Sequence, residues 1–139
     1  MITLEERKKH MKYIINLFDT IKNSININEK YFSYLIIIAH TILIGSCILY
    51  LILFKIDNIY FIFILFWILL IFFHFYFNGC FLTRIERHYL KDDKWYGPPT
   101  IPFLMLGYLI SKDEANNFIY ICSFIITTII MVKLFLYLY

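Results

Sequence analysis

Charged residues are scarce in this chain of 139 residues: they make up 17% of the sequence, against about 25% in typical soluble domains. Hydrophobic residues account for 61% and aromatic residues for 21%. A domain of this size has a large surface and a small core, so it cannot bury all of these apolar side chains in its interior. The composition excludes a disordered chain, a secreted disulfide scaffold and an ordinary cytosolic enzyme. It predicts that apolar side chains face lipid.

Several residue types are almost missing. Val occurs once, Ala twice and Gln not at all, whereas Ile occurs 28 times. Val and Ala suit lipid-facing positions as well as Ile does, so we interpret this bias as the codon usage of an AT-rich genome, and the abundant aromatic residues are no evidence of a cofactor site. The three cysteines, Cys47, Cys80 and Cys122, form no disulfide framework and are interpreted as small apolar residues.

Three long apolar segments predict an all-α integral membrane protein with three transmembrane helices. Residues 31–54 and 59–77 carry no charge, and residues 118–139 carry only Lys133, near the C-terminus. Each is long enough, at 1.5 Å per residue, to cross about 30 Å of hydrocarbon. The short polar link at 55–58 makes the first two spans an antiparallel hairpin.

The N-terminal arm, residues 1–30, has the pattern of an amphipathic helix. Thr3 and Glu6 form a capping box. Apolar residues then recur at helical spacing: Leu4, Met11, Ile14, Phe18, Ile21 and Ile25. We interpret this face either as a surface that lies on the membrane or on the protein's own cytoplasmic side, or as one that binds a partner.

The connection between the second and third spans, residues 78–117, contains a short apolar stretch at 100–110. It is too short to span a membrane and is interrupted by Pro102 and Gly107. We expect an interfacial segment, a re-entrant segment or a contact surface for a partner. Ser111 and Glu114 form a capping box that starts the last helix before the membrane.

Basic residues are concentrated on one side of the predicted topology. Six of the 13 Lys and Arg residues fall in residues 1–30 and five in residues 78–117. The positive-inside rule places both segments, and the N-terminus, in the cytoplasm or its organellar equivalent, and the C-terminus on the far side. The polar, partly acidic start predicts neither a cleavable signal peptide nor a mitochondrial presequence. Because acids are interleaved with the basic residues, we expect no nucleic-acid partner.

Four residues around the end of the second span suggest chemistry: His74, Cys80, Glu86 and His88. These residue types bind zinc or act as nucleophile and base. Glu86 and His88 face different sides of a helix, however, and no pair has the i, i+3 or i, i+4 spacing of helical ligands. In the alternative interpretation Asn78 and Gly79 end the span, Thr83 and Glu86 form a capping box, and a surface helix runs to about Lys91. That interpretation leaves no catalytic residue, no metal and no cofactor.

The pattern Cys80-x-Leu82-Thr83-x-x-Glu86-x-x-x-Leu90 resembles the Cys-Pro-Leu-Thr-x-x-Glu segment that follows a membrane helix in a group of small, uncharacterised bacterial integral-membrane proteins. It covers about a dozen residues, and this chain has Phe81 in place of the proline. The resemblance implies a small polytopic membrane protein and no particular activity.

Few polar groups lie inside the spans. His40 lies near the middle of the first span. We interpret it either as a residue of a proton path or binding site, or as an imidazole that hydrogen-bonds a neighbouring helix. By helical rise His40 and His74 differ in depth by roughly 9 Å, so we do not expect them to share an ion. Thr41 with Gly45, and Ser123 with Thr127, form small-residue faces that predict tight packing of the first helix on the third. The second span would then present bulky side chains to lipid or a partner.

These patterns favour a non-enzymatic accessory, assembly or structural subunit of a larger membrane complex, or of a viral or organellar membrane. Its expected partners are the lipid bilayer and other membrane subunits. The alternative is a small membrane enzyme or metal-binding protein with its site at the cytoplasmic mouth of the second span. A channel or carrier would need a polar path, for which His40 is the residue-level support.

Overall fold

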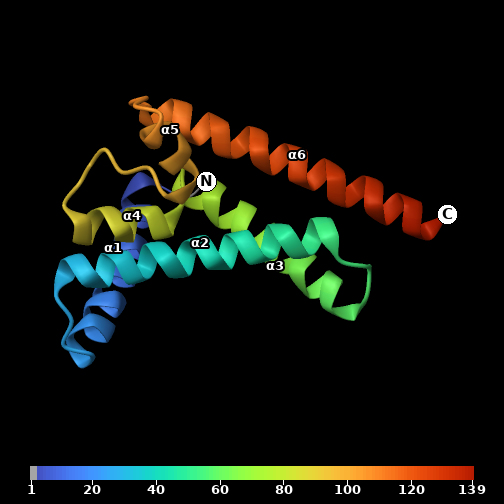
Figure 1. The fold of residues 1–139 in the computed structure, drawn as a ribbon. Coiled ribbons are helices and arrows are strands. Elements are labelled where there is room, and N and C mark those ends of the chain that lie inside the picture. Colours follow the sequence, from blue (N-terminus) through green and yellow to red (C-terminus); the bar gives the residue numbers. More distant parts are fainter. Residues whose placement is uncertain (1–2) are drawn as a thin grey trace.

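The chain is all α-helical over the residues that the computed structural model describes, 3–139 (Figure 1). The elements are α1 (Leu4–Ser24), α2 (Glu29–Leu53), α3 (Asn58–Phe77), α4 (Phe81–Leu90), a 3-10 turn η1 (Pro98–Thr100), α5 (Ile101–Met105) and α6 (Lys112–Leu138). Three of them, α2, α3 and α6, are long and apolar enough to cross a membrane. The prediction of an all-α fold with three candidate spans is confirmed.

Helix ends are set by local capping, largely as predicted. Thr3 and Glu6 form a reciprocal capping box at the start of α1, and Ser111 and Glu114 form another at the start of α6. Asn78 ends α3 in the left-handed conformation, with φ of 51°. This turn redirects the chain into α4, which places the residues just beyond the span against the bundle.

The capping box predicted for Thr83 and Glu86 is wrong. Helix α4 begins at Phe81, with Cys80 as its N-cap residue. Thr83 is therefore the third residue of the helix, and Glu86 lies in its middle, fully buried. The Glu86 carboxylate is held by tertiary contacts and does not cap the helix.

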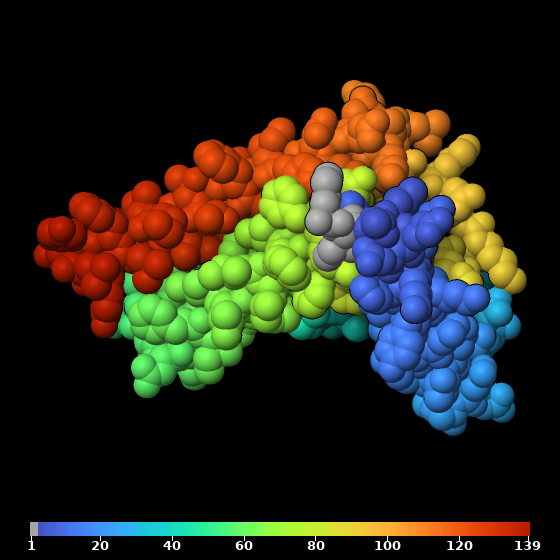
Figure 2. Space-filling model, turned by 180° about the vertical axis from the view of Figure 1, so that it is seen from behind, coloured from blue at the N-terminus to red at the C-terminus, as the bar shows by residue number. Residues whose placement is uncertain are grey.

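The helix α1 docks on the rest of the chain beside the start of α2 and the end of α3. Figure 2 shows it packed side-on against this end of the molecule, with the last turns of α6 projecting at the other. Met11 is buried, and Ile14 and Phe18 pack against the same apolar cluster, which includes Phe32 and Ile85. Leu4, Ile21 and Ile25 of the predicted stripe stay exposed. The apolar face is thus covered by the protein in its middle and open at both ends.

A second apolar cluster joins the three long helices in the other half of the molecule. It contains Cys47 and Leu51 from α2, Tyr60 and Trp67 from α3, and Ile130 from α6. The indole of Trp67 also donates a hydrogen bond to the Thr127 hydroxyl, at 3.1 Å. This cluster fixes α3 and α6 around the end of α2.

Helix α2 contacts α6 through Cys47, Leu51 and Ile130, but within residues 3–139 the small-residue faces predicted for this contact do not meet. Thr41 is exposed and its hydroxyl donates to the Ile37 carbonyl of its own helix, while a side chain added at Gly45 would meet nothing within 4 Å. Ser123 accepts from Thr127 along α6. Because Thr127 also receives the Trp67 indole, this face of α6 turns to α3, and the Thr41–Gly45 face of α2 is left open.

Residues 98–110 form η1, the short helix α5 and an extended end. Leu106 and Leu109 are 73% and 83% exposed. The stretch lies at the end of the molecule that carries α4 (Figure 1). It does not cross between the ends of the long helices.

Candidate functional site

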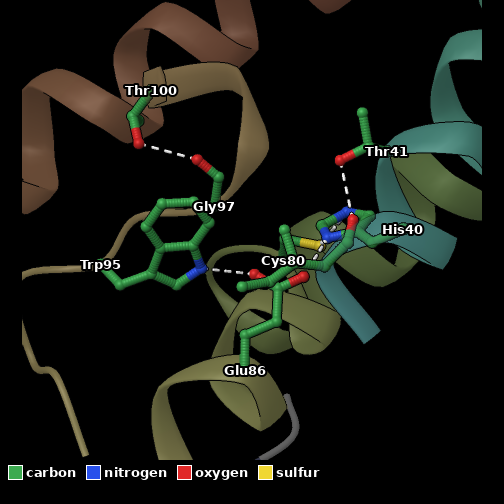
Figure 3. Close-up of polar contacts among 8 residues, drawn as sticks. His40, Thr41, Cys80, Glu86, Trp95, Gly97 and Thr100 are labelled. Atoms are coloured by element: carbon green, nitrogen blue, oxygen red, sulfur yellow. Dashed lines mark hydrogen bonds and ion pairs between the residues drawn. The ribbon is translucent and has the colours of Figure 1, made fainter. Parts of the chain in front are cut away.

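The site is built around His40, which is 2% exposed in the middle of α2. Its Nδ1 lies 2.6 Å from Glu86 Oε1, and its Nε2 lies 3.4 Å from Cys80 Sγ. Figure 3 shows the imidazole between the thiol and the carboxylate, with the two partners on the chain after α3. We call Cys80, His40 and Glu86 the buried triad.

Glu86 is held on both of its oxygens. Oε1 faces His40, and Oε2 accepts a hydrogen bond of 2.5 Å from the Trp95 indole (Figure 3). A buried carboxylate is tolerated only when hydrogen bonds and an opposite charge replace its lost water. The two bonds fix the orientation of the carboxylate and, through it, that of the imidazole.

The chain after α4 folds back so that Trp95 can reach Glu86. Gly97 allows this close approach because it has φ of 94°, and a side chain there would overlap with the Thr83 hydroxyl of α4. The Thr100 hydroxyl closes the turn by donating to the Gly97 carbonyl at 2.7 Å. This segment therefore belongs to the support of the triad.

Cys80 stands at the N-terminus of α4, where a thiolate is stabilised. Burial raises the pKa of the Cys80 thiol, but the hydrogen bond and charge of His40 and the backbone and hydroxyl donors of Thr83 lower it by more, so that the net pKa lies below the ordinary value. Backbone N–H groups in the first turn of a helix have no partner within the helix and favour negative charge. Such a cysteine has the character of a nucleophile.

An apolar cavity of about 290 Å³ adjoins the triad between the long helices. We call it the interhelical cavity. Its walls come from α2, α3, α4 and α6, with Ile44, Leu70, Phe118 and Ile126 among them, and both His40 and Cys80 reach it. For comparison, a cavity of about 150 Å³ lined by apolar side chains is large enough to bind benzene. The interhelical cavity therefore suits an apolar ligand that ends beside Cys80.

His74 also lines the interhelical cavity. Its ring packs edge-on against Tyr120, and its buried Nε2 has no hydrogen-bond partner among residues 3–139. Buried polar atoms are normally paired. This nitrogen is therefore available to a polar atom of a bound ligand.

The structure rearranges the candidates that the sequence suggested. Cys80 and Glu86 meet at His40, His74 lines the adjoining cavity, and His88 is exposed with its ring against Tyr89. No group of three or more His, Cys, Asp or Glu residues within 3–139 is arranged to hold a metal ion. His40, which seemed isolated in its span, is the centre of the site, and Cys80 is a polar partner instead of a small apolar residue.

The triad contains the three residue types that thiol-based acyl transfer uses. The imidazole contacts the thiol through one nitrogen and the carboxylate through the other, which is the order of groups in a nucleophile, base and orienting acid. The first-turn N–H groups of α4 beside Cys80 are suited to stabilise an oxyanion. Each of these groups comes from a helix or a helix end.

Neither a family model, nor a curated protein, nor a solved structure matches this chain.

Proposed function

We propose that this chain is a thiol-dependent membrane enzyme that transfers or hydrolyses acyl groups at Cys80. The observation that carries the proposal is the placement of His40 between Cys80 Sγ, at 3.4 Å, and Glu86 Oε1, at 2.6 Å. The interhelical cavity beside the thiol supports an apolar acyl chain as the substrate.

The reaction follows from the roles of the triad. The Cys80 thiolate attacks the acyl carbonyl carbon, a carbon–sulfur bond forms, and the carbonyl electron pair moves to oxygen. When the carbonyl re-forms, the bond to the leaving oxygen or sulfur breaks, and that atom takes the proton held on His40 Nε2. Water, or an alcohol, amine or thiol acceptor, then gives its proton to His40 and attacks the thioester, which releases Cys80.

The experiment is acylation of the purified full chain by a long-chain acyl thioester with a clickable tail. We expect a hydroxylamine-labile label at Cys80, located by peptide mass spectrometry. Cys80→Ala should abolish it, whereas Cys122→Ala, which removes another cysteine from the same cavity, should not. His40→Gln should slow it by about 100-fold, the scale of general-base catalysis.

The outcome of this experiment separates catalysis from a structural role. If His40 and Glu86 serve only to hold α4 on α2, the thiol should react at the same rate in wild type and in folded His40→Gln protein. That result, or an unlabelled wild type, would overturn the proposal. Folding of each variant is checked by its elution from size-exclusion chromatography in detergent.

The second candidate function is that of an accessory subunit of a membrane complex. The observation that favours it is the open Thr41–Gly45 face of α2, together with the exposed apolar side chains of α3 such as Ile62 and Leu65. Close-packing faces of this kind serve helix association in membranes. Gly45→Leu would then release a partner that co-purifies in mild detergent, and a partner retained by this variant would count against the α2 face.

Two further points belong to the proposal. The basic segments, residues 1–30 and 78–117, would place α1, α4 and the triad on the cytoplasmic side. The likeness of residues 80–90 to a segment of small bacterial membrane proteins would make the chain a relative of that group, and it implies no activity.

A further inference from the structure

A small polar hollow lies next to Cys80, and its lining differs from that of the interhelical cavity. It has a volume of about 20 Å³ and is lined by Cys80 and Thr83, by the cations Arg84, Arg87 and Lys112, and by the Asn116 amide, among others. A volume of about 10–15 Å³ is enough for one water-sized group. The hollow therefore admits one polar oxygen, with the rest of a headgroup outside it.

The hollow carries uncompensated positive charge. Its lining includes three cations and no carboxylate, and within residues 3–139 none of these three cations forms an ion pair with a carboxylate. Burial and the neighbouring charges of Arg87 and Arg7 lower the pKa of Arg84. Clustered cations of this kind are stabilised by a bound anion.

Two of the cations have side-chain donors that are available to a ligand. The Arg87 guanidinium lies over the Tyr96 ring, 5.3 Å from its centre, and its buried Nε has no hydrogen-bond partner among residues 3–139. Lys112 opens α6 and is exposed. Arg84 differs from them because it donates to the carbonyls of Phe77 and Asn78 and so caps α3. An incoming anion would therefore meet Arg87 and Lys112 with free donors.

Cys80 is the residue that the two spaces share, together with Thr83 and Ile119. We propose that the substrate is an acyl chain with a phosphate-bearing head, whose tail fills the interhelical cavity while a phosphate oxygen enters the polar hollow at Arg87 and Lys112. The linking carbonyl then lies at Cys80 Sγ. This inference rests on the proposed acyl transfer and names its substrate class.

The chemistry of the hollow favours phosphate over a neutral head. A guanidinium presents several N–H donors in a planar fork that matches phosphate oxygens, and the Arg87 guanidinium lies over the Tyr96 ring beside the hollow. Lys112 adds charge and Asn116 a neutral amide. A neutral or zwitterionic head would leave these cations without an equal counter-charge.

Binding to Cys80→Ala protein tests the headgroup without any chemistry. The probes are two single-chain lipids with the same fluorescent tail, one with a phosphate monoester head and one with a choline phosphate head. We expect the phosphate monoester to bind at least tenfold more tightly at low salt. Adding Arg87→Gln and Lys112→Gln should remove that preference, whereas the matched control Lys55→Gln, an exposed cation in the α2–α3 link, should keep it.

Equal binding of the two lipids, or a preference that survives both substitutions, would overturn this inference and leave the acyl transfer untouched. Conversely, selective binding without acylation of wild-type Cys80 would refute the acyl transfer and leave an anionic lipid site. Two donors then distinguish the sources of the head: a phospholipid in vesicles and a single-chain acyl phosphate, each with a clickable chain. The donor that labels Cys80 faster, with a rate lowered at least fivefold by the double substitution, is the source.

Discussion

The residues of the buried triad depend on one another for their place inside the protein. An imidazole in a membrane span and a buried carboxylate are each costly when unpaired. Here His40 satisfies Glu86 on one side and Cys80 on the other, and Trp95 takes the remaining carboxylate oxygen. The same bonds that make burial tolerable also place the imidazole beside the thiol, so that the stability of the site and the proposed reactivity would arise from one arrangement.

Alkylation of Cys80 should persist at a pH where ordinary cysteines no longer react. The thiolate is the reactive form, and a free thiol with a pKa of about 8.5 loses about tenfold in rate per pH unit below that value. Because His40 and Thr83 lower the Cys80 pKa, its rate should begin to fall at a lower pH. The measurement is iodoacetamide labelling across pH in Cys47→Ala, Cys122→Ala protein.

The control for this pH profile is His40→Gln in the same background. Without the imidazole the Cys80 profile should move toward that of an ordinary thiol, and the rate at neutral pH should drop by about tenfold or more. A profile that is identical with and without His40 would contradict the assignment of His40 as the base.

The triad could be predicted from the sequence only in part. The sequence indicates His74, Cys80, Glu86 and His88 as chemically suited, because these residue types gather around the end of the second span, and two of the four belong to the triad. The i, i+3 and i, i+4 spacings identify partners on the same helix only. The partner of Glu86 is His40, which lies 46 residues earlier on another helix. The helical rise gives the depths of His40 and His74 along their own spans. It does not give the position of the residues in the turn beyond α3. No local pattern encodes how that turn folds α4 back onto α2.

At the scale of elements, the support of the site depends on one glycine after α4. Gly97→Ala should displace the 95–100 segment, because the new side chain overlaps with Thr83 and the backbone φ is positive. Trp95 would then lose its bond to Glu86, and we expect a lower melting temperature with faster digestion of this segment. Gly45→Ala is the matched control, since its side chain meets nothing within 4 Å and alanine favours helix by about 1 kcal/mol. Equal melting of both variants would refute this role of Gly97.

Lys133 of α6 caps the C-terminal end of α2, at the end of the molecule opposite α4. Its ammonium donates to the carbonyls of Leu51 and Ile52, both at 3.2 Å, and to that of Phe54, and lies over the Tyr60 ring. These carbonyls end α2 and lack helical partners. Lys133→Met should therefore cost about 0.5–1.5 kcal/mol, the net contribution of a hydrogen bond, because the Ile52 and Phe54 carbonyls are exposed and the Leu51 carbonyl keeps its bond from the Tyr60 hydroxyl. The measurement is stability to denaturing detergent. Lys55→Met, which removes an exposed lysine, should cost much less; equal losses would contradict the capping role.

Elements were more predictable than their contacts. Uninterrupted apolar runs and the boxes Thr3–Glu6 and Ser111–Glu114 depend on neighbouring residues, and these helices begin where the pattern indicates. The Thr83–Glu86 box has the same sequence signature, and it fails because burial of Glu86 against His40 outweighs a surface cap.

The two ends of the molecule differ in the elements and charged residues that they hold. One end holds α1, α4, the triad and the polar hollow, and the other holds the α2–α3 link and the C-terminus, joined by Lys133 (Figure 1). Eleven of the 13 basic residues lie in the segments at the first end. Nine of the ten acidic residues lie in the same segments, so a phosphate-bearing substrate would be attracted by the local cations of the polar hollow and not by the net charge of this end.

This inequality predicts the topology in a membrane. In protein without native cysteines, single cysteines placed by Asn23→Cys and Asp93→Cys should react with a membrane-impermeant maleimide from one side. Those placed by Lys55→Cys and Tyr139→Cys should react from the other, because α2 and α6 each separate these positions by a length that spans hydrocarbon. By the positive-inside rule we expect the first side to be the cytoplasmic one. Labelling of Asp93→Cys and Lys55→Cys from the same side would show that α3 does not span, and would remove the triad from the membrane surface where its substrate is expected.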